Sequence, residues 1–147
     1  MKTLYTLIFC GVLVLATSSI GYGNSDDATK KFKSYINKTV QKVESAETPG
    51  QKRAVLNESF DTMLEAFERV ESMERIPAAD KEGVAGLRRD IQEKNNELNG
   101  RDGFRRVSDS QLDNFAKYVQ QDMEQADKTV TISITTLLLI IIIILLI

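Results

Sequence analysis

Residues 99–112 hold the densest group of side chains that could bind a metal ion. Asp102, Asp109 and the polar residues between them faintly follow the calcium-binding helix–loop–helix pattern. That loop needs acidic residues at alternate positions and a bidentate Glu at its end. Arginines interrupt the spacing, and Gln111 stands where the Glu belongs. We therefore expect a turn followed by a helix that Ser108 caps with Gln111 in capping-box position, and no calcium site.

A cluster of arginines surrounds the same loop. Its members come from the loop and from the segment before it: Arg88, Arg89, Arg101, Arg105 and Arg106. Such a cluster can bind lipid phosphates or an acidic partner. Asp90, Asp102 and Asp109 lie close by in the sequence. We expect these carboxylates to pair with the arginines on a solvated surface.

The side chains used most often in catalysis and metal binding are scarce in this chain. It has no His and no Trp, and its one cysteine is Cys10. Because most acid–base, nucleophilic and metal sites use His or Cys, we predict no enzyme activity, no catalytic residue, no metal site and no cofactor. The formal net charge of −2 is too small for the basic field of a nucleic-acid-binding protein.

The N-terminal residues 1–23 have the pattern of a secretory signal peptide. Lys2 precedes an apolar stretch over residues 4–16, and small polar residues follow to Gly23, after which we expect cleavage. An uncleaved membrane anchor is the alternative. Lipidation of Cys10 would need a small residue directly before the cysteine and a longer apolar stretch, and this chain has neither.

The C-terminal residues 129–147 carry no charge, and residues 137–147 are all Leu or Ile. A helix of this length reaches about 28 Å, close to the hydrocarbon thickness of a bilayer. We therefore predict a transmembrane anchor over 129–147. Hydroxyl and apolar residues alternate from Thr129 to Thr135, which is a strand pattern. Helix is expected over most of Ile134 to Ile147, because a lone strand in lipid leaves its backbone groups unsatisfied.

Between the two ends, apolar residues recur at three- and four-residue steps in four segments, about 27–46, 51–75, 78–98 and 108–128. This period predicts amphipathic helices. Proline and glycine at 48–50 and Pro77 separate the first three. Gly83 and Gly86 lower the helix propensity of the third segment, so we expect that helix to begin near Gly86. Phe60 and Phe67 have the spacing of core residues.

The third segment has a thinner apolar pattern than the others. Lys94 interrupts it where another apolar residue is expected. Four residues, which we call the seam, follow a seven-residue rhythm: Val84, Leu87, Ile91 and Leu98. A narrow seam is typical of a coiled-coil contact. If the seam packs inside the domain, we expect Lys94 at its edge with its ammonium in water. If it joins two chains, Lys94 limits how tightly they pair.

These patterns predict an all-α protein, a small antiparallel bundle of about four helices with a signal peptide (1–23), an extracytoplasmic domain (24–128) and a C-terminal transmembrane helix (129–147). The expected function is structural or protein-interaction, through an envelope partner or self-association, with the lipid bilayer contacted by the C-terminal helix. One alternative is a binding module for a small ligand, lipid or cation. Another is a spanin-like protein that bridges two membranes. The expected location is the periplasm or the cell surface.

Overall fold

The computed structural model describes residues 25–129 and 131–147, in which helices are the only regular structure. The predicted signal peptide, residues 1–23, lies outside this part of the chain. Five α-helices and one short 3₁₀ turn follow in order: α2 (Ser25–Ser45), α3 (Pro49–Ser72), α4 (Ala78–Asn99), η1 (Asp109–Gln111), α5 (Leu112–Thr129) and α6 (Ile134–Leu146). The prediction of an all-helical bundle is therefore confirmed.

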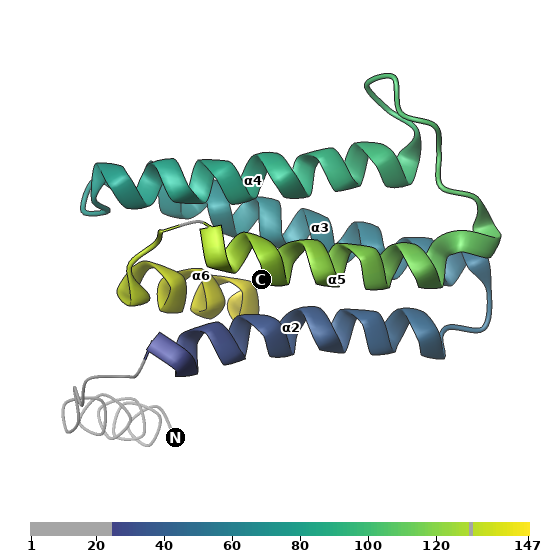
Figure 1. Ribbon diagram of the computed structural model, residues 1–147, viewed down its shortest axis with the longest axis horizontal. Helices are drawn as coiled ribbons and strands as arrows, with labels where there is room; N and C mark the ends of the chain where they lie inside the picture. The colour runs from purple at the N-terminus through teal and green to yellow at the C-terminus, as the bar shows by residue number, and fades with distance from the viewer. Residues whose placement is uncertain (1–24, 130) are drawn as a thin grey trace, which may run out of the picture.

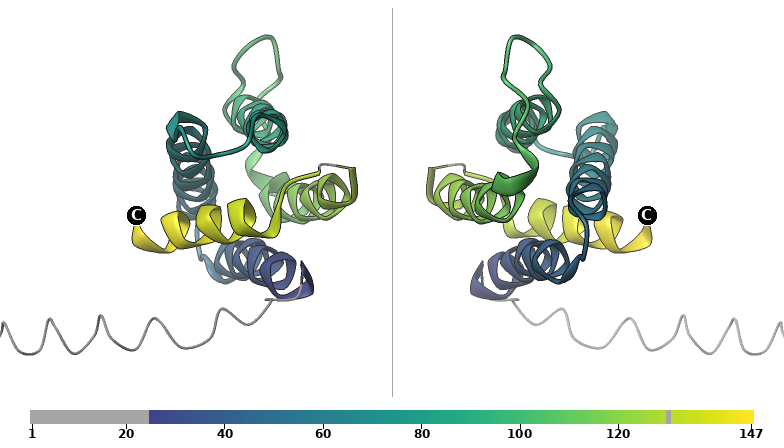
Figure 2. Two further views of the ribbon diagram at one scale, coloured as in Figure 1. Left: turned by 90° about the vertical axis from the view of Figure 1, so that its left-hand side faces the viewer. Right: turned by 90° about the vertical axis from the view of Figure 1, so that its right-hand side faces the viewer.

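The axes of the first four helices are roughly parallel to one another (Figure 1). Successive helices are antiparallel, as expected for this kind of bundle. The start of α2 and the end of α5 therefore lie at the same end of the bundle (Figure 1). From there the chain turns, and α6 crosses the long axis of the bundle against α2 and α3 (Figure 2).

The start of α3 has a complete capping box. The Thr48 hydroxyl accepts from the Gln51 backbone N–H, and the Gln51 side chain accepts from the Thr48 backbone N–H, over 3.2 and 3.1 Å. Pro49 stands in the first turn, where its missing N–H costs nothing. The capping box expected at Ser108 is absent. There the hydroxyl lies 2.8 Å from the Gln111 Oε1 and makes no hydrogen bond to the backbone.

Helix α4 begins earlier than its glycines suggest. The expected start near Gly86 is wrong, because α4 is helical from Ala78. Two contacts outweigh the low helix propensity of Gly83 and Gly86. Val84 is fully buried, and Asp80 is bonded to the chain ahead of α6. A Cβ at Gly86 would meet nothing within 4 Å, so no close approach requires glycine there.

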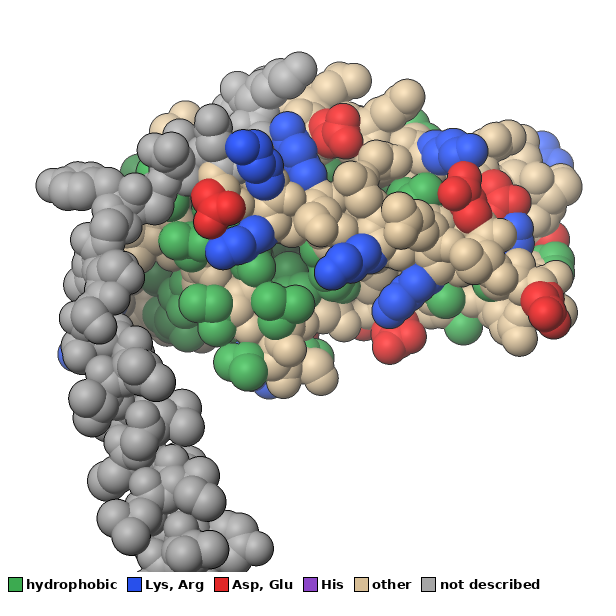
Figure 3. All heavy atoms as spheres, turned by 90° about the horizontal axis from the view of Figure 1, so that it is seen from below, with side chains coloured by type: hydrophobic (Ala, Val, Ile, Leu, Met, Phe, Trp, Pro, Cys, Tyr) green, Lys and Arg blue, Asp and Glu red, His purple; other side chains and the backbone are tan. Residues whose placement is uncertain are grey.

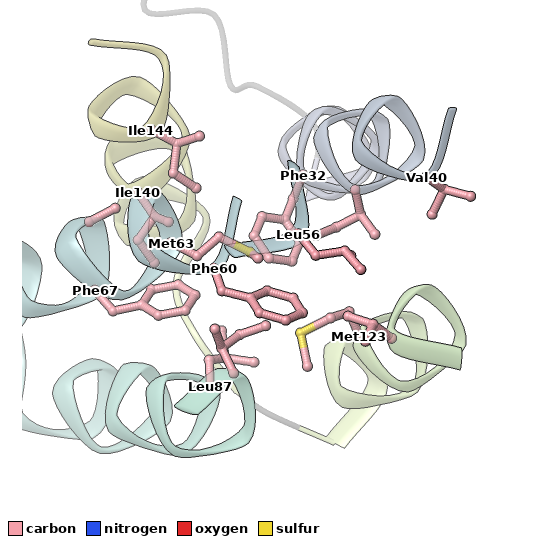
Figure 4. Packing of buried hydrophobic residues seen from close by; sticks show 14 of the residues in the cluster. Phe32, Val40, Leu56, Phe60, Met63, Phe67, Leu87, Met123, Ile140 and Ile144 are labelled. Atoms are coloured by element: carbon pink, nitrogen blue, oxygen red, sulfur yellow. The ribbon is translucent and has the colours of Figure 1, made fainter. Parts of the chain in front are cut away.

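A single apolar core runs along the bundle and continues under α6. Phe60 and Phe67 are 1% and 0% exposed, which confirms their predicted place in the core. The Phe60 ring meets the ring of Phe115 on α5 edge to face, with centroids 6.5 Å apart. Ile140 and Ile144 of α6 belong to this core, and Figure 4 shows them beside Met63 of α3.

The C-terminal segment differs from the predicted transmembrane helix. Helix α6 starts at Ile134, close to where the sequence predicted helix, and its 13 residues reach about 20 Å. Within residues 25–129 and 131–147 no helix combines the length and the apolar composition needed to cross a membrane. The apolar run instead covers core residues of α2 and α3. Composition alone does not distinguish a helix that enters lipid from a helix that packs on the protein's own core.

Candidate functional site

The start of α6 is fixed by its own cap. Ser133 is the N-cap residue, and its hydroxyl accepts from the backbone N–H of Thr136 over 3.3 Å. Ile132 and Ser133 lie outside any helix, and the backbone of Ser133 is extended. The Ser133 cap therefore marks the point at which the chain enters α6.

A buried carboxylate of another helix meets this cap. Asp80, in the first turn of α4, is 7% exposed and accepts hydrogen bonds from the backbone N–H of Ser133 over 3.1 Å and from the hydroxyls of Ser133 and Thr136. A negative charge at a helix N-terminus is also favoured by the helix dipole. These contacts tie the start of α6 to the start of α4.

The hydrogen bonds favour the ionised form of Asp80. Burial raises the pKa of this carboxyl, but the hydrogen bonds from Ser133 and Thr136 outweigh burial and leave the pKa below its ordinary value of 3.8. The ionised form is therefore the one that holds α6. Sequence reasoning missed Asp80, because its partners lie 53 and 56 residues further along the chain.

The two faces of α6 have different surroundings. One face is buried against the bundle and carries Ile140, Ile141, Ile143 and Ile144. The other face is open to solvent although it is equally apolar: Ile142, Leu145 and Leu146 are 52%, 73% and 79% exposed. Large apolar side chains exposed together on one surface mark a site that binds a membrane or another protein. We call these three residues the exposed stripe.

Two hollows flank the C-terminal end of α6, with volumes of about 320 and 230 Å³. Both are lined by Ile144 and Leu145 on one side and by Tyr35 and Lys38 of α2 on the other. The larger hollow also reaches Lys42, Glu58 and Ser59, and the smaller reaches Lys31. Apolar surface from α6 and lysines from α2 therefore meet at the same place.

The polar wall of the larger hollow is a short hydrogen-bonded chain. The Ser59 hydroxyl donates to the Tyr35 hydroxyl over 3.3 Å and lies 3.0 Å from the hydroxyl of Thr39. Burial raises the pKa of Tyr35, opposed by hydrogen bonds from Ser59 and Thr62. Tyr35 is therefore neutral near pH 7, and these three residues contribute hydroxyl groups to a hollow whose charges come from other residues.

A second polar cluster joins α4 to α5 inside the bundle. The Lys94 ammonium donates to the Tyr118 hydroxyl over 2.6 Å, lies 3.1 Å from the carboxylate of Asp122 and stands 4.1 Å from the centre of the Tyr118 ring. Burial lowers the pKa of Lys94, but its bonds to Tyr118 and Asp122 raise it more, so its pKa lies above the ordinary value. The charge is therefore held by partners within the domain.

The seam packs inside the domain, since all four of its residues are buried. The position expected for Lys94 in that case is wrong, because this residue is 6% exposed and its ammonium contacts α5 rather than water. Lysine is tolerated at this depth because a tyrosine hydroxyl and a carboxylate face it. The sequence did not indicate that Lys94 is buried, because Tyr118 and Asp122 are far from Lys94 in the chain.

The acidic residues of the 99–112 region do not gather around a common point. Asp102 accepts from the side-chain amide of Asn96 over 2.7 Å, and Asp109 accepts from the buried Arg53 over 3.0 Å. Arg53 also donates to the backbone carbonyls of Leu98 and Val107. These contacts hold the loop against the bundle. Among the described residues, no group of three or more metal-ligating side chains is arranged to hold an ion.

The predicted arginine cluster is divided between α4 and the loop that follows it, and Arg88 and Arg89 line a hollow together with Asp102 of that loop. Arg101, Arg105 and Arg106 are exposed on the loop at the far end of the bundle from α6, as seen in Figure 1. Arg88 pairs with Glu71 of α3 over 2.7 Å, and Asp109 pairs with Arg53 instead of a loop arginine. The pairing expected from sequence proximity is therefore wrong at Asp109, because the helices bring closer partners.

Comparisons of the chain with protein-family models, with curated proteins and with solved structures find no match. A functional assignment therefore rests on the geometry of α6 and its surroundings. This region offers apolar side chains, hydroxyl groups and lysines, and these groups suit binding to an amphiphilic surface better than bond-making chemistry.

Proposed function

We propose that this protein is a membrane-anchored helical protein of structural or protein-interaction type, attached to the bilayer through its C-terminal helix. The observation that carries this proposal is the exposed stripe, in which Leu145 and Leu146 are largely open to solvent. Burying a leucine side chain in an apolar medium is worth about 1.5–3 kcal/mol. Two such residues at the tip of α6 favour contact with lipid.

The attachment takes one of two forms. In the first, α6 stays on the bundle and its exposed stripe enters the interface between headgroups and acyl chains. In the second, α6 leaves the bundle and a helix over residues 129–147 spans the bilayer, at a length of about 28 Å. The second form breaks the bonds between Asp80 and Ser133, so the first requires less rearrangement of the structure.

The remaining surface of the bundle is proposed to contact an envelope partner or a second copy on the extracytoplasmic side. Export rests on the predicted signal peptide, residues 1–23. The alternative function, a binding module for a small ligand, lipid or cation, is supported by the two hollows beside α6. The spanin-like alternative rests on lipidation of Cys10, which lies outside the described residues.

The test is co-flotation of the purified chain with phosphatidylcholine vesicles. Mass spectrometry of the intact chain first establishes where its N-terminus lies. Leu145→Gln combined with Leu146→Gln removes the two most exposed leucines without opening the core. We expect this double variant to lose at least tenfold in vesicle partitioning, because each leucine no longer gains from entering lipid. All variants share one N-terminus, so a difference between them reports on α6.

The matched control is Phe104→Gln, which removes another exposed apolar side chain on the loop between α4 and η1. It should partition like the wild type. The proposal fails if the Leu145→Gln/Leu146→Gln variant floats with the vesicles as well as this control does. Thermal melting of both variants excludes unfolding as the cause of a difference.

A further inference from the structure

The helix beside the exposed stripe has a charge opposite to that of the whole chain. The full sequence has a net charge of −2, whereas α2 carries five lysines against three acidic residues. One of these acidic residues, Glu44, pairs with Lys117 of α5 over 2.9 Å. Positive charge is therefore concentrated on α2, the helix against which α6 lies.

Three of the α2 lysines lie on one side of the helix. Lys31, Lys38 and Lys42 are separated by seven and four residues, which places them on a common stripe of an α-helix. Each lines one or both hollows at the end of α6, together with Leu145. Figure 3 shows basic side chains in a row along the border of the apolar surface on this side of the molecule.

The charges facing these lysines are few. Lys31 pairs with Asp27 over 3.2 Å, and Glu58 of α3 lines the larger hollow. Within the described part of the chain neither Lys38 nor Lys42 forms an ion pair, and both are exposed. Their charges are therefore available to a negatively charged partner.

We infer that the surface formed by the exposed stripe and by Lys31, Lys38 and Lys42 docks on an anionic lipid bilayer. This inference rests on the proposed function and adds the chemistry and the orientation of the contact. The leucines would enter the acyl region while the lysines meet headgroup phosphates beside it, as in amphipathic helices that lie in the membrane interface. The arginines of the 100–108 loop would then face away from the membrane.

The charge pattern favours a membrane over a small anionic ligand. The lysines are spread along α2 over two hollows instead of converging on one point, and Glu58 shares the larger hollow with them. A single phosphate would meet Glu58 as well as a lysine. A bilayer surface accommodates several separated lysines, and each contributes its own attraction to the negative surface potential.

The test compares flotation on phosphatidylcholine vesicles with flotation on vesicles that also contain phosphatidylglycerol, at low salt. The variants are Lys38→Gln with Lys42→Gln, and, as a control with the same charge change, Arg101→Gln with Arg105→Gln. We expect the wild type to bind anionic vesicles at least tenfold better than neutral ones. The lysine variant should lose most of this difference, and the arginine control should keep it.

Salt gives a second readout. Raising the ionic strength to about 1 M shortens the screening length to about 3 Å, so the anionic preference of the wild type should disappear while its binding to neutral vesicles remains. Equal binding to both kinds of vesicle, or equal losses in the lysine and arginine variants, would overturn the inference and leave the proposed function standing. If Leu145→Gln/Leu146→Gln has no effect on neutral vesicles, the proposed function itself fails. If free inorganic phosphate at equal ionic strength displaces the wild type while chloride does not, a small-anion site replaces the membrane surface.

Discussion

The backbone N–H of Ser133 donates to the carboxylate of Asp80 over 3.1 Å, and this bond joins the N-terminal turns of α4 and α6. The hydroxyls of Ser133 and Thr136 donate to the same carboxylate. One buried side chain therefore receives three hydrogen bonds from the start of the C-terminal helix. Whether α6 stays on the bundle depends on this residue as well as on apolar packing.

Asp80→Asn should loosen α6 without unfolding the bundle. The asparagine amide has one acceptor oxygen, whereas the carboxylate has two. It also lacks the negative charge that strengthens the three hydrogen bonds to Asp80. We expect the opening of α6 to become easier by about 1–3 kcal/mol, the usual cost of hydrogen bonds lost to a charged acceptor. Hydrogen exchange of the α6 amides, followed by mass spectrometry, measures this change.

The pH dependence of that exchange comes from the lowered pKa of Asp80. The stabilisation is complete above the ordinary pKa of 3.8 and is lost as the pH falls through the lower pKa of the folded state. Wild-type α6 should therefore open more readily below about pH 3.8, and Asp80→Asn should not show this step. Asp27→Asn, at an exposed ion pair, is the control. A step of equal size in Asp80→Asn would assign it to another group.

Phe60→Ala and Phe67→Ala should each destabilise the bundle by about 3–5 kcal/mol. Both rings are buried, and Phe60 also loses its edge-to-face contact with Phe115. Urea unfolding followed by circular dichroism gives the free energy of unfolding. Phe104→Ala removes a ring that is 36% exposed and should change it little. Losses as small as that of Phe104→Ala would mean that the packing around these rings is not maintained in solution.

Lys94→Met should lower the free energy of unfolding by about 1–3 kcal/mol. The substitution keeps the length of the side chain but removes the charged hydrogen bonds to Tyr118 and Asp122. The cost is limited because Asp122 remains partly exposed to water. Lys117→Met, at an exposed pair with Glu44, is the control and should have little effect.

Sedimentation of the same Lys94→Met variant tests the other interpretation of the seam. Because the seam is buried inside one chain, the wild type and the variant should sediment alike. New dimers in the variant would show that this face of α4 is accessible to a second copy, contrary to its packing within one chain.

The helical period predicted the bundle because each amphipathic segment has one apolar stripe, which it can bury against the stripes of the other segments. Phe60 and Phe67 are buried for that reason, and helix α6 begins at Ile134, where Ser133 caps it. The start of α4 was not predictable from local propensity. Val84 and Asp80 acquire their partners only when distant segments meet, and those contacts outweigh the two glycines.

The amino-acid sequence by itself determined the helices, their order and the apolar character of residues 137–147, because these depend on composition and on local spacing. The tertiary structure alone decided where that apolar segment lies. Core residues of α2 and α3 bury one face of α6, and the Asp80 carboxylate binds its first turn. Apolar side chains gain a similar free energy from entering lipid and from entering a protein core. The apolar surface of α2 and α3 and the carboxylate of Asp80 are therefore what place α6 on the bundle.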